Sequence, residues 1–259
     1  MSPMARRRFL RLAAGSFLPG ALAGCDRLAS SDAFNGTLRS AQFLSKRAQA
    51  LLTGPEAMAQ EFTEADIAGE FRSNGTAMPD SALYRQLLAG QFRDWRLQVS
   101  GMVERPAEYS LPELQAMPAR TQITRHDCVE GWSVIGKWTG VPLRHLLAQV
   151  QPLPAARYVV FHCADPMDGS DVQAPNSTYY ESIDLIEAVH PQTILAYALN
   201  DEALPVKNGA PLRLRVERQL GYKQAKYLMR ILVVARLGHI RGGAGGYWED
   251  RGYEWYAGI

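Results

Sequence analysis

Cysteine is scarce in this sequence, which has three among 259 residues: Cys25, Cys128 and Cys163. Three thiols are too few for a fold that depends on a framework of disulfide bonds. The absence of any Cys-x-x-Cys spacing excludes zinc-ribbon, thioredoxin-type and c-type haem motifs. The sequence also lacks an excess of one sign of charge. It has 28 Lys and Arg against 26 Asp and Glu, which gives a formal net charge of +2. This near balance argues against a strongly basic nucleic-acid-binding protein.

The sequence also lacks the composition of a disordered chain. Its hydrophobic content of 47% and charged content of 21% are ordinary for a packed globular protein. The length suits one large domain or two small ones. The five histidines show no pair with metal-ligand spacing, which argues against a zinc site.

The N-terminus carries a short apolar run after a basic stretch. Residues 12–22 are apolar or small, too few for the roughly 20 residues of a membrane-spanning helix. They follow Arg6, Arg7, Arg8 and Arg11, and residues 1–24 contain no acid. A basic region followed by a short apolar run is typical of a secretory signal, so we expect residues 1–24 to be a signal peptide.

Two short motifs refine this expectation. Residues 6–11, RRRFLR, resemble the twin-arginine export motif, whose pathway carries proteins that are already folded. Residues 22–25, LAGC, resemble a bacterial lipobox, in which Cys25 would carry the lipid; a plain signal peptide with a chance cysteine is the alternative. The sequence therefore predicts a lipid anchor at Cys25, on the periplasmic face of a bacterial membrane. Without residues 1–24 the net charge becomes −2.

Hydrophobic patterns indicate a strand-rich domain after a tether. Residues 25–69 are polar and alanine-rich and are expected to form a tether with a first helix or two. Apolar residues alternate with polar ones along residues 95–100, as in a half-buried strand. Further strands are expected at residues 158–161, 212–216 and 231–235.

Helices are expected to be short. Ser110 and Glu113 resemble a capping box that opens a helix ending at Met117, and two more helices are expected to begin near Val141 and Ile183. Strands and short helices without regular βαβ alternation predict an α+β fold for residues 70–259 rather than a Rossmann sheet.

The most unusual segment is residues 125–133, RHDCVEGWS. It places Cys128 beside a base, a histidine and two acids, in a turn-like region. Three interpretations fit these residue types: a thiolate nucleophile, a soft metal ligand, or a buried structural cysteine. The residue types alone leave all three open.

A family resemblance narrows these interpretations. CVEGWS, followed about ten residues on by WTGVPL, resembles the molybdopterin-binding domain of the sulfite-oxidase family, and within it the bacterial periplasmic methionine-sulfoxide reductases. In that family the matching cysteine binds molybdenum through its thiolate. The resemblance implies that Cys128 is the metal ligand and that the cofactor is molybdenum-molybdopterin, a centre for which a soft thiolate is suited.

Further patches in the family's order extend the resemblance over residues 70–259. They are residues 71–74 (FRSN), 190–205 (HPQTILAYALNDEALP), 208–213 (NGAPLR) and 221–226 (GYKQAK). Gly75 stands where the family frequently has a histidine. The fold implied is a mixed, β-rich molybdopterin-binding domain.

The resemblance also implies which residues contact the cofactor. They are Asn74, Gly75, Cys163, Asn208, Arg213, Lys223, Gln224, Ala225 and Lys226. Basic side chains at positions 213, 223 and 226 are expected to bind the phosphate and pterin. Backbone N–H groups of Gln224 and Ala225 are expected to face the phosphate.

Some of these residues have plainer alternatives. Asn208 also suits a turn before a glycine, and Cys163, where the reductases have a threonine, also suits a small core position. Lys223, Lys226 and Arg230 recur at helical spacing. We expect Arg215, Arg218 and Arg230 to lie at the surface.

Two catalytic residues follow from the same resemblance. Glu130 matches an acid that could relay a proton near the metal, and Tyr179 or its neighbour Tyr180 matches the active-site tyrosine. The sulfite oxidases of animals and plants carry arginines shortly after the cysteine, whereas this chain has Glu130 and Trp132 there. This difference favours sulfoxide reduction over sulfite oxidation.

The C-terminal part departs from those sulfite oxidases, which continue into a dimerisation domain. The sequence ends at Ile259, so a monomer without that domain is expected. The glycine run 242–246 is expected to be a flexible hinge. The aromatic residues after it are expected to pack over the domain, and a role in gating the substrate is the alternative.

The leading hypothesis is therefore an exported, lipid-anchored molybdenum oxidoreductase that transfers an oxygen atom to or from a small substrate such as a sulfoxide. Without a haem motif it would exchange electrons with a separate partner, and the resemblance implies a membrane haem protein. The alternatives are a cysteine-nucleophile hydrolase or transferase that uses Cys128, and a lipoprotein binding module that has lost the metal.

Overall fold

The computed structural model describes residues 31, 44, 54, 56–167 and 177–259. The expected signal peptide at residues 1–24, the expected lipid site at Cys25 and most of the expected tether lie outside the described residues. Residues 53–259 form one compact unit. Among the described residues, no helix combines the length and the apolarity that crossing a membrane requires.

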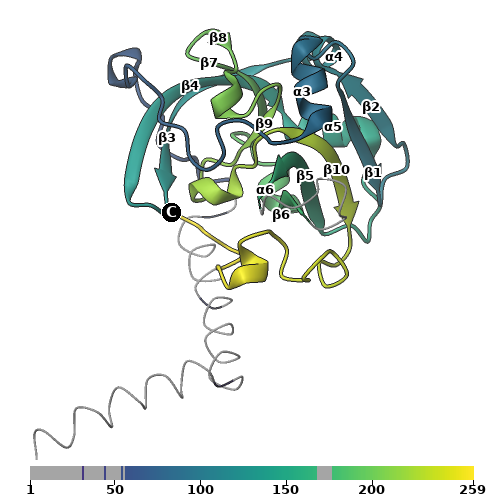
Figure 1. Ribbon diagram of the computed structural model, residues 1–259. Helices are drawn as coiled ribbons and strands as arrows, with labels where there is room; N and C mark the ends of the chain where they lie inside the picture. Colours follow the sequence, from purple (N-terminus) through teal and green to yellow (C-terminus); the bar gives the residue numbers. More distant parts are fainter. Residues whose placement is uncertain (1–30, 32–43, 45–53, 55, 168–176) are drawn as a thin grey trace, which may run out of the picture. The chain divides into compact units, whose positions relative to one another are not determined.

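Two five-stranded sheets build this unit. The first has the strand order β2 (Ala107–Ser110), β1 (Arg96–Gly101), β10 (Leu228–Val234), β5 (Tyr158–Pro166) and β6 (Thr178–Asp184). In the second, β3 (Arg120–Cys128), β4 (Trp132–Pro142), β7 (Ile194–Leu199) and β8 (Glu202–Ala203) follow one another, and β9 (Arg213–Arg215) also pairs with β7. Figure 1 shows β3 and β4 on the opposite side of the unit from β1 and β2.

The first sheet is mixed, because β1 runs parallel to β10 whereas its other neighbouring strands are antiparallel. Short helices connect and cover the strands. They are α3 (Ala82–Ala89), α4 (Leu111–Ala116), α5 (Leu143–Val150) and α6 (Leu185–Ala188), with single 3₁₀ turns η1 (Glu64–Asp66), η2 (Val206–Asn208), η3 (Gly221–Lys223) and η4 (Glu249–Arg251). The expected mixed, β-rich α+β fold is confirmed.

Local sequence accounts for several of these elements. In β1, Leu97 and Val99 are buried while Arg96 and Gln98 are exposed, as the alternation predicts. At α4, the hydroxyl of Ser110 accepts the amide of Glu113, whose carboxylate accepts the amide of Ser110, so the predicted capping box is confirmed. The helix α5 buries Leu143, Leu146, Leu147 and Val150 in the main core with β1, β5 and β10.

Three expectations about the basic segment after residue 212 are wrong. The helical spacing of Lys223, Lys226 and Arg230 does not correspond to a helix, because η3 ends at Lys223 and β10 begins at Leu228. Arg215 is completely buried rather than at the surface. Arg218 is largely buried and pairs with Glu187 at 2.6 Å, whereas Arg230 is exposed as expected. Acids that lie close in the fold explain the burial of both arginines.

Candidate active site

One cavity gathers most of the predicted site. Cys128 ends β3 and faces Trp132, the first residue of β4, across a tight turn that Gly131 closes with a positive φ of 82°. Seven residues that the sequence predicts for the site line this cavity: Asn74, Gly75, Cys128, Glu130, Tyr179, Gln224 and Lys226. They come from separate segments of the chain, so the fold itself brings the predicted residues together.

Cys128 is a buried, free thiol at this cavity, with 8% of its surface exposed. Burial raises the pKa of the Cys128 thiol, although hydrogen bonds from the backbone N–H groups of Glu130 and Val129 lower it in part. An activated nucleophile needs the opposite shift, so this environment does not favour a cysteine hydrolase. A bound metal cation would instead hold the thiolate, which is the chemistry of a single soft ligand.

Four predicted cofactor residues bury a polar atom that has no hydrogen-bond partner in the part of the chain described. These atoms are Asn74 Oδ1, Asn208 Nδ2, Arg213 Nε and Gln224 Oε1. Each such atom costs about 1–3 kcal/mol when it is left unsatisfied. The set mixes donors with acceptors, as the edges of a pterin require, so the residues present fit the expected cofactor.

Two buried cations lie beside these atoms. The ammonium of Lys226 donates to the carbonyls of Asn74 at 2.7 Å and Thr76 at 2.5 Å. Burial, together with the charge of Arg213, lowers the pKa of Lys226 to about 7. Burial likewise lowers the pKa of Arg213 to about 9, and its guanidinium donates to the carbonyl of Asn208 at 2.9 Å. This concentration of buried positive charge suits an anionic group such as a phosphate.

The side chain of Lys223 has partners other than the cofactor phosphate that the sequence predicts for it. Its ammonium lies 2.5 Å from both Glu181 and Glu249, all three side chains are buried, and Lys223 does not line the cavity. The predicted phosphate contact of Lys223 is therefore not what the structure shows. The backbone N–H of Gln224 is also engaged, since it donates to the carbonyl of Gly221 at 3.1 Å.

Two further predicted residues lie in the core. The Cys163 thiol is buried, and its register partner is Leu228 in the neighbouring strand β10. Burial raises its pKa well above the ordinary value. Ala225 is also buried in the main core, and neither residue lines the cavity. For Cys163 this location agrees with the core alternative.

The two candidate tyrosines on β6, Tyr179 and Tyr180, have different locations relative to the cavity. Tyr179 lines the cavity, and its hydroxyl donates to the carbonyl of Tyr222, while burial raises its pKa well above 10. Tyr180 points elsewhere, because its hydroxyl donates to the carboxylate of Asp250 at 2.5 Å. Tyr179 is therefore the tyrosine at the site.

Glu130 is held at the cavity beside Cys128. Its carboxylate accepts the indole N–H of Trp132 at 2.8 Å. The guanidinium of Arg72 stacks over the same indole, 4.6 Å from the ring centroid. Glu130 thus has a fixed position two residues from the predicted metal ligand.

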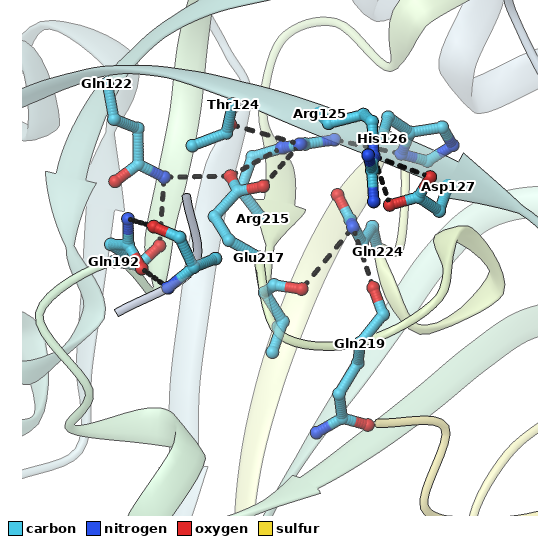
Figure 2. A network of polar contacts seen from close by, with 12 residues as sticks. Gln122, Thr124, Arg125, His126, Asp127, Gln192, Arg215, Glu217, Gln219 and Gln224 are labelled. Atoms are coloured by element: carbon cyan, nitrogen blue, oxygen red, sulfur yellow. Dashed lines mark hydrogen bonds and ion pairs between the residues drawn. The ribbon is translucent and has the colours of Figure 1, made fainter. Parts of the chain in front are cut away.

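A buried polar network lies behind the cavity (Figure 2). Arg215 donates to Glu217 at 2.6 and 2.9 Å and to Nδ1 of His126 at 3.0 Å. The amide of Gln122 donates to the same Glu217 carboxylate at 2.8 Å. Nearby, Gln224 donates to the carbonyl of Gln219 at 3.1 Å, which orients its side chain at the cavity.

Aromatic residues of the C-terminal segment also line the cavity, a location that agrees with the alternative of a role at the substrate. They are Trp248 and Tyr253, with Tyr222 beside them. The expectation that this segment packs over the domain is correct in part, but two of its rings belong to the site. The clustering of tyrosine and tryptophan after residue 246 was the signal available in the sequence.

Comparison with known proteins gives the following matches. The family model described as the oxidoreductase molybdopterin-binding domain matches residues 86–238. YedZ1 of Azospira oryzae, named as a putative subunit of a protein-methionine-sulfoxide reductase, is 36% identical over 98% of this chain and 88% of its own length. The protein-methionine-sulfoxide reductase catalytic subunit MsrP of Ralstonia nicotianae is 37% identical over 67% of this chain and 53% of its own length. The sulfane dehydrogenase SoxCD of Paracoccus pantotrophus covers 56% of this chain, with 23% identity and a TM-score of 0.48; the match spans 39% of its own chain.

Proposed function

Because the chain belongs to the family of oxidoreductases with a molybdopterin-binding domain, we propose that it reduces sulfoxides to thioethers. The names of the two reductase relatives support this substrate class. The chain spans about half the length of the Ralstonia reductase, so the substrate is part of the proposal. Overall, a sulfoxide, two electrons and two protons become a thioether and water.

The convergence of the predicted residues on one cavity is the observation that carries this proposal. Among the residues that line the cavity, Cys128 would hold the molybdenum, Asn74 and Gln224 would meet the pterin edges, and Lys226 would bind the phosphate. Asn208 and Arg213 are buried and do not line the cavity, and the Arg213 guanidinium donates to the carbonyls of Asn208 and Gln224, so these two residues would support the site from behind. When bound, the cofactor supplies two-electron redox chemistry and an acceptor for the oxygen atom.

The protein's own residues would bind substrate and handle protons. The Glu130 carboxylate, fixed by the indole of Trp132, is placed to hold and deliver a proton at the cavity next to Cys128. The same negative charge would repel the dianion sulfite, which favours a neutral sulfoxide. Burial raises the pKa of Tyr179, so its hydroxyl keeps its proton. This hydroxyl would therefore orient the substrate rather than exchange a proton with it.

The cellular setting is the sequence-based part of the proposal. Twin-arginine export and a lipid anchor at Cys25 on the periplasmic face are proposed from the motifs described above. The electrons would come from a membrane haem protein. Export of a folded protein suits a cofactor that is inserted before transport.

The test uses the full chain, purified from a host that makes the cofactor. Wild type should contain about one molybdenum per chain and reduce methionine sulfoxide with a reduced viologen dye, and Cys128→Ser should lose both the metal and the activity. Cys163→Ala is the matched comparison, since this second buried cysteine does not itself line the cavity. Folded wild type with less than about a tenth of an equivalent of metal would contradict the proposal.

A further inference from the structure

Two aromatic rings of the C-terminal segment form one wall of the cavity. Trp248 and Tyr253 stack on each other, with ring centroids 5.2 Å apart and an angle of 29° between their planes. Tyr222 meets Tyr253 edge-on at 5.4 Å, and all three rings line the cavity together with Val129 and Glu130. Aromatic surface therefore lies in the same cavity as the predicted metal ligand.

A buried ion-pair cluster fixes this wall in place. Glu249, which follows Trp248 directly, lies 2.5 Å from the ammonium of Lys223, and that ammonium also pairs with Glu181 on β6. Next in the chain, Asp250 accepts the hydroxyl of Tyr180 and the amide of Ala244 at 2.9 Å. The 3₁₀ turn η4 is thus attached to β6 of the first sheet through two successive acids.

The glycine run before the wall is packed against its neighbours, which corrects the expected flexible hinge. A Cβ atom at Gly246 would overlap the carboxylates of Glu249 and Glu181. One at Gly242 would lie 2.5 Å from the carboxyl carbon of Asp250, and one at Gly245 would lie 2.7 Å from the ring of Trp255. These glycines let the segment approach the sheet closely enough for Trp248 to reach the cavity.

The two sides of the cavity differ in chemistry. Asn74 and Lys226 supply polar atoms, whereas Trp248 and Tyr253 offer aromatic surface. A sulfoxide derived from methionine has both characters, with a polar S=O group beside a methyl and two methylene groups. The methylene groups of a methionine-like chain can pack on these rings in addition to the sulfur and its methyl group, whereas a compact sulfoxide has no such chain to place there.

We propose that Trp248 and Tyr253 bind the thioalkyl part of the substrate and so select sulfoxides with a methionine-like chain over compact sulfoxides. This inference rests on the proposed sulfoxide reduction. In the proposed arrangement, the rings of Trp248 and Tyr253 bind the substrate, whereas Cys128 and the polar residues of the cavity bind the cofactor.

Steady-state kinetics of the molybdenum-loaded full chain test the proposal, with N-acetylmethionine sulfoxide and dimethyl sulfoxide as substrates. In Trp248→Ala the KM for the methionine derivative should rise about tenfold while kcat and the KM for dimethyl sulfoxide stay within about twofold, because the longer chain alone spans the wall. Trp248→Phe, which keeps a ring, should stay near wild type. Tyr253→Ala, at a residue 42% exposed, should move the KM in the same direction with little effect on folding.

Three further measurements make the result decisive. Molybdenum content should be unchanged in these variants, and Tyr109→Ala on the distant strand β2 should leave both KM values unaltered. In wild type, N-acetylmethionine sulfoxide should quench a tryptophan fluorescence component that Trp248→Phe lacks.

If wild type reduces both sulfoxides but the ratio of KM values is the same in Trp248→Ala and Tyr253→Ala as in wild type, the wall proposal is overturned and the proposed function stands. If loaded wild type reduces neither substrate, the proposed function fails and this inference fails with it.

Discussion

The guanidinium of Arg215 lies 3.0 Å from Nδ1 of His126, and both side chains are completely buried (Figure 2). Burial, with the charge of Arg215, lowers the pKa of His126 well below its ordinary value, so the imidazole is neutral. Because arginine can only donate, Nδ1 accepts and the ring proton lies on Nε2. That N–H lies close to the side chain of Gln224 and against Gly221, and both of these residues line the cavity.

Removal of the acid that supports this arrangement should destabilise the protein strongly. In Glu217→Ala, Arg215 loses both hydrogen bonds of its ion pair and remains buried. Breaking a buried pair in this way typically costs about 3–5 kcal/mol, so the free energy of unfolding in urea should fall by that order. The exposed pair of Lys207 and Glu70 is the control, and Glu70→Ala should leave the urea midpoint unchanged.

The double variant Arg215→Met, Glu217→Leu distinguishes an unpaired charge from lost packing. Because apolar residues of similar volume often replace buried ion pairs without loss, much of the stability should return in the double variant. Equal losses in the single and the double variant would show that the cost arises instead from packing, or from the polar groups of His126 and Gln122 that lose a partner.

Local patterns in the sequence predicted those parts of the fold that depend on neighbouring residues. The alternation before residue 101 gave the strand β1, and Ser110 with Glu113 gave the start of α4. The motif patches around Asn74, Cys128 and Gln224 also converge in space as the resemblance implied. These predictions succeeded because the signal lies within one segment or one motif.

The basic residues after position 212 could not be assigned in the same way. Lys223 and Lys226 are the same residue type three positions apart, yet one pairs with two buried acids and the other faces the cavity. The difference depends on Glu181, which is 42 positions away in the chain, and on Glu249. The sequence shows that acids exist but not which of them reaches a given lysine. The aromatic wall depends in the same way on glycines that pack against distant side chains.

Loss of the cap at the start of α4 should have a modest, local effect. Ser110→Ala removes the hydroxyl that accepts the amide of Glu113, and such N-cap losses typically cost about 1 kcal/mol of stability. Urea unfolding should show this decrease, while Ser110→Thr should retain most of the stability. Equal stability of the alanine variant and wild type would contradict a stabilising role for this cap.

Two glycines of the C-terminal segment offer a matched comparison. Gly246→Ala should lower thermal stability, because the added methyl group would overlap Glu249 and Glu181 in the buried cluster. Gly238→Ala is the control, since nothing lies within 4 Å of the position that its methyl group would take and its φ is ordinary. A lower melting temperature for Gly246→Ala alone is expected in differential scanning calorimetry. Equal melting temperatures for the two variants would mean that the segment is not held by this cluster.

The buried ammonium of Lys226 should make the stability of the cofactor-free protein depend on pH. Its pKa is about 7 in the folded protein, mainly because of burial and then because of Arg213, against 10.5 in the unfolded chain. Above pH 7 the unfolded chain therefore binds more protons at this residue than the folded chain does. Stability should rise with pH from 7 to 9, by at most about 1.4 kcal/mol per pH unit.

Urea unfolding at pH 7, 8 and 9 measures this effect, with Lys226→Met as the comparison, because every other titrating group is the same in both proteins. The variant should lack the part of the slope that Lys226 contributes. A phosphate bound beside the ammonium would stabilise its charge and raise its pKa, so the cofactor-loaded wild type should show a smaller slope than the cofactor-free wild type. Identical slopes for the cofactor-free wild type and Lys226→Met would show that the lysine does not titrate in this range. The cavity would then already stabilise its charge without an anionic ligand.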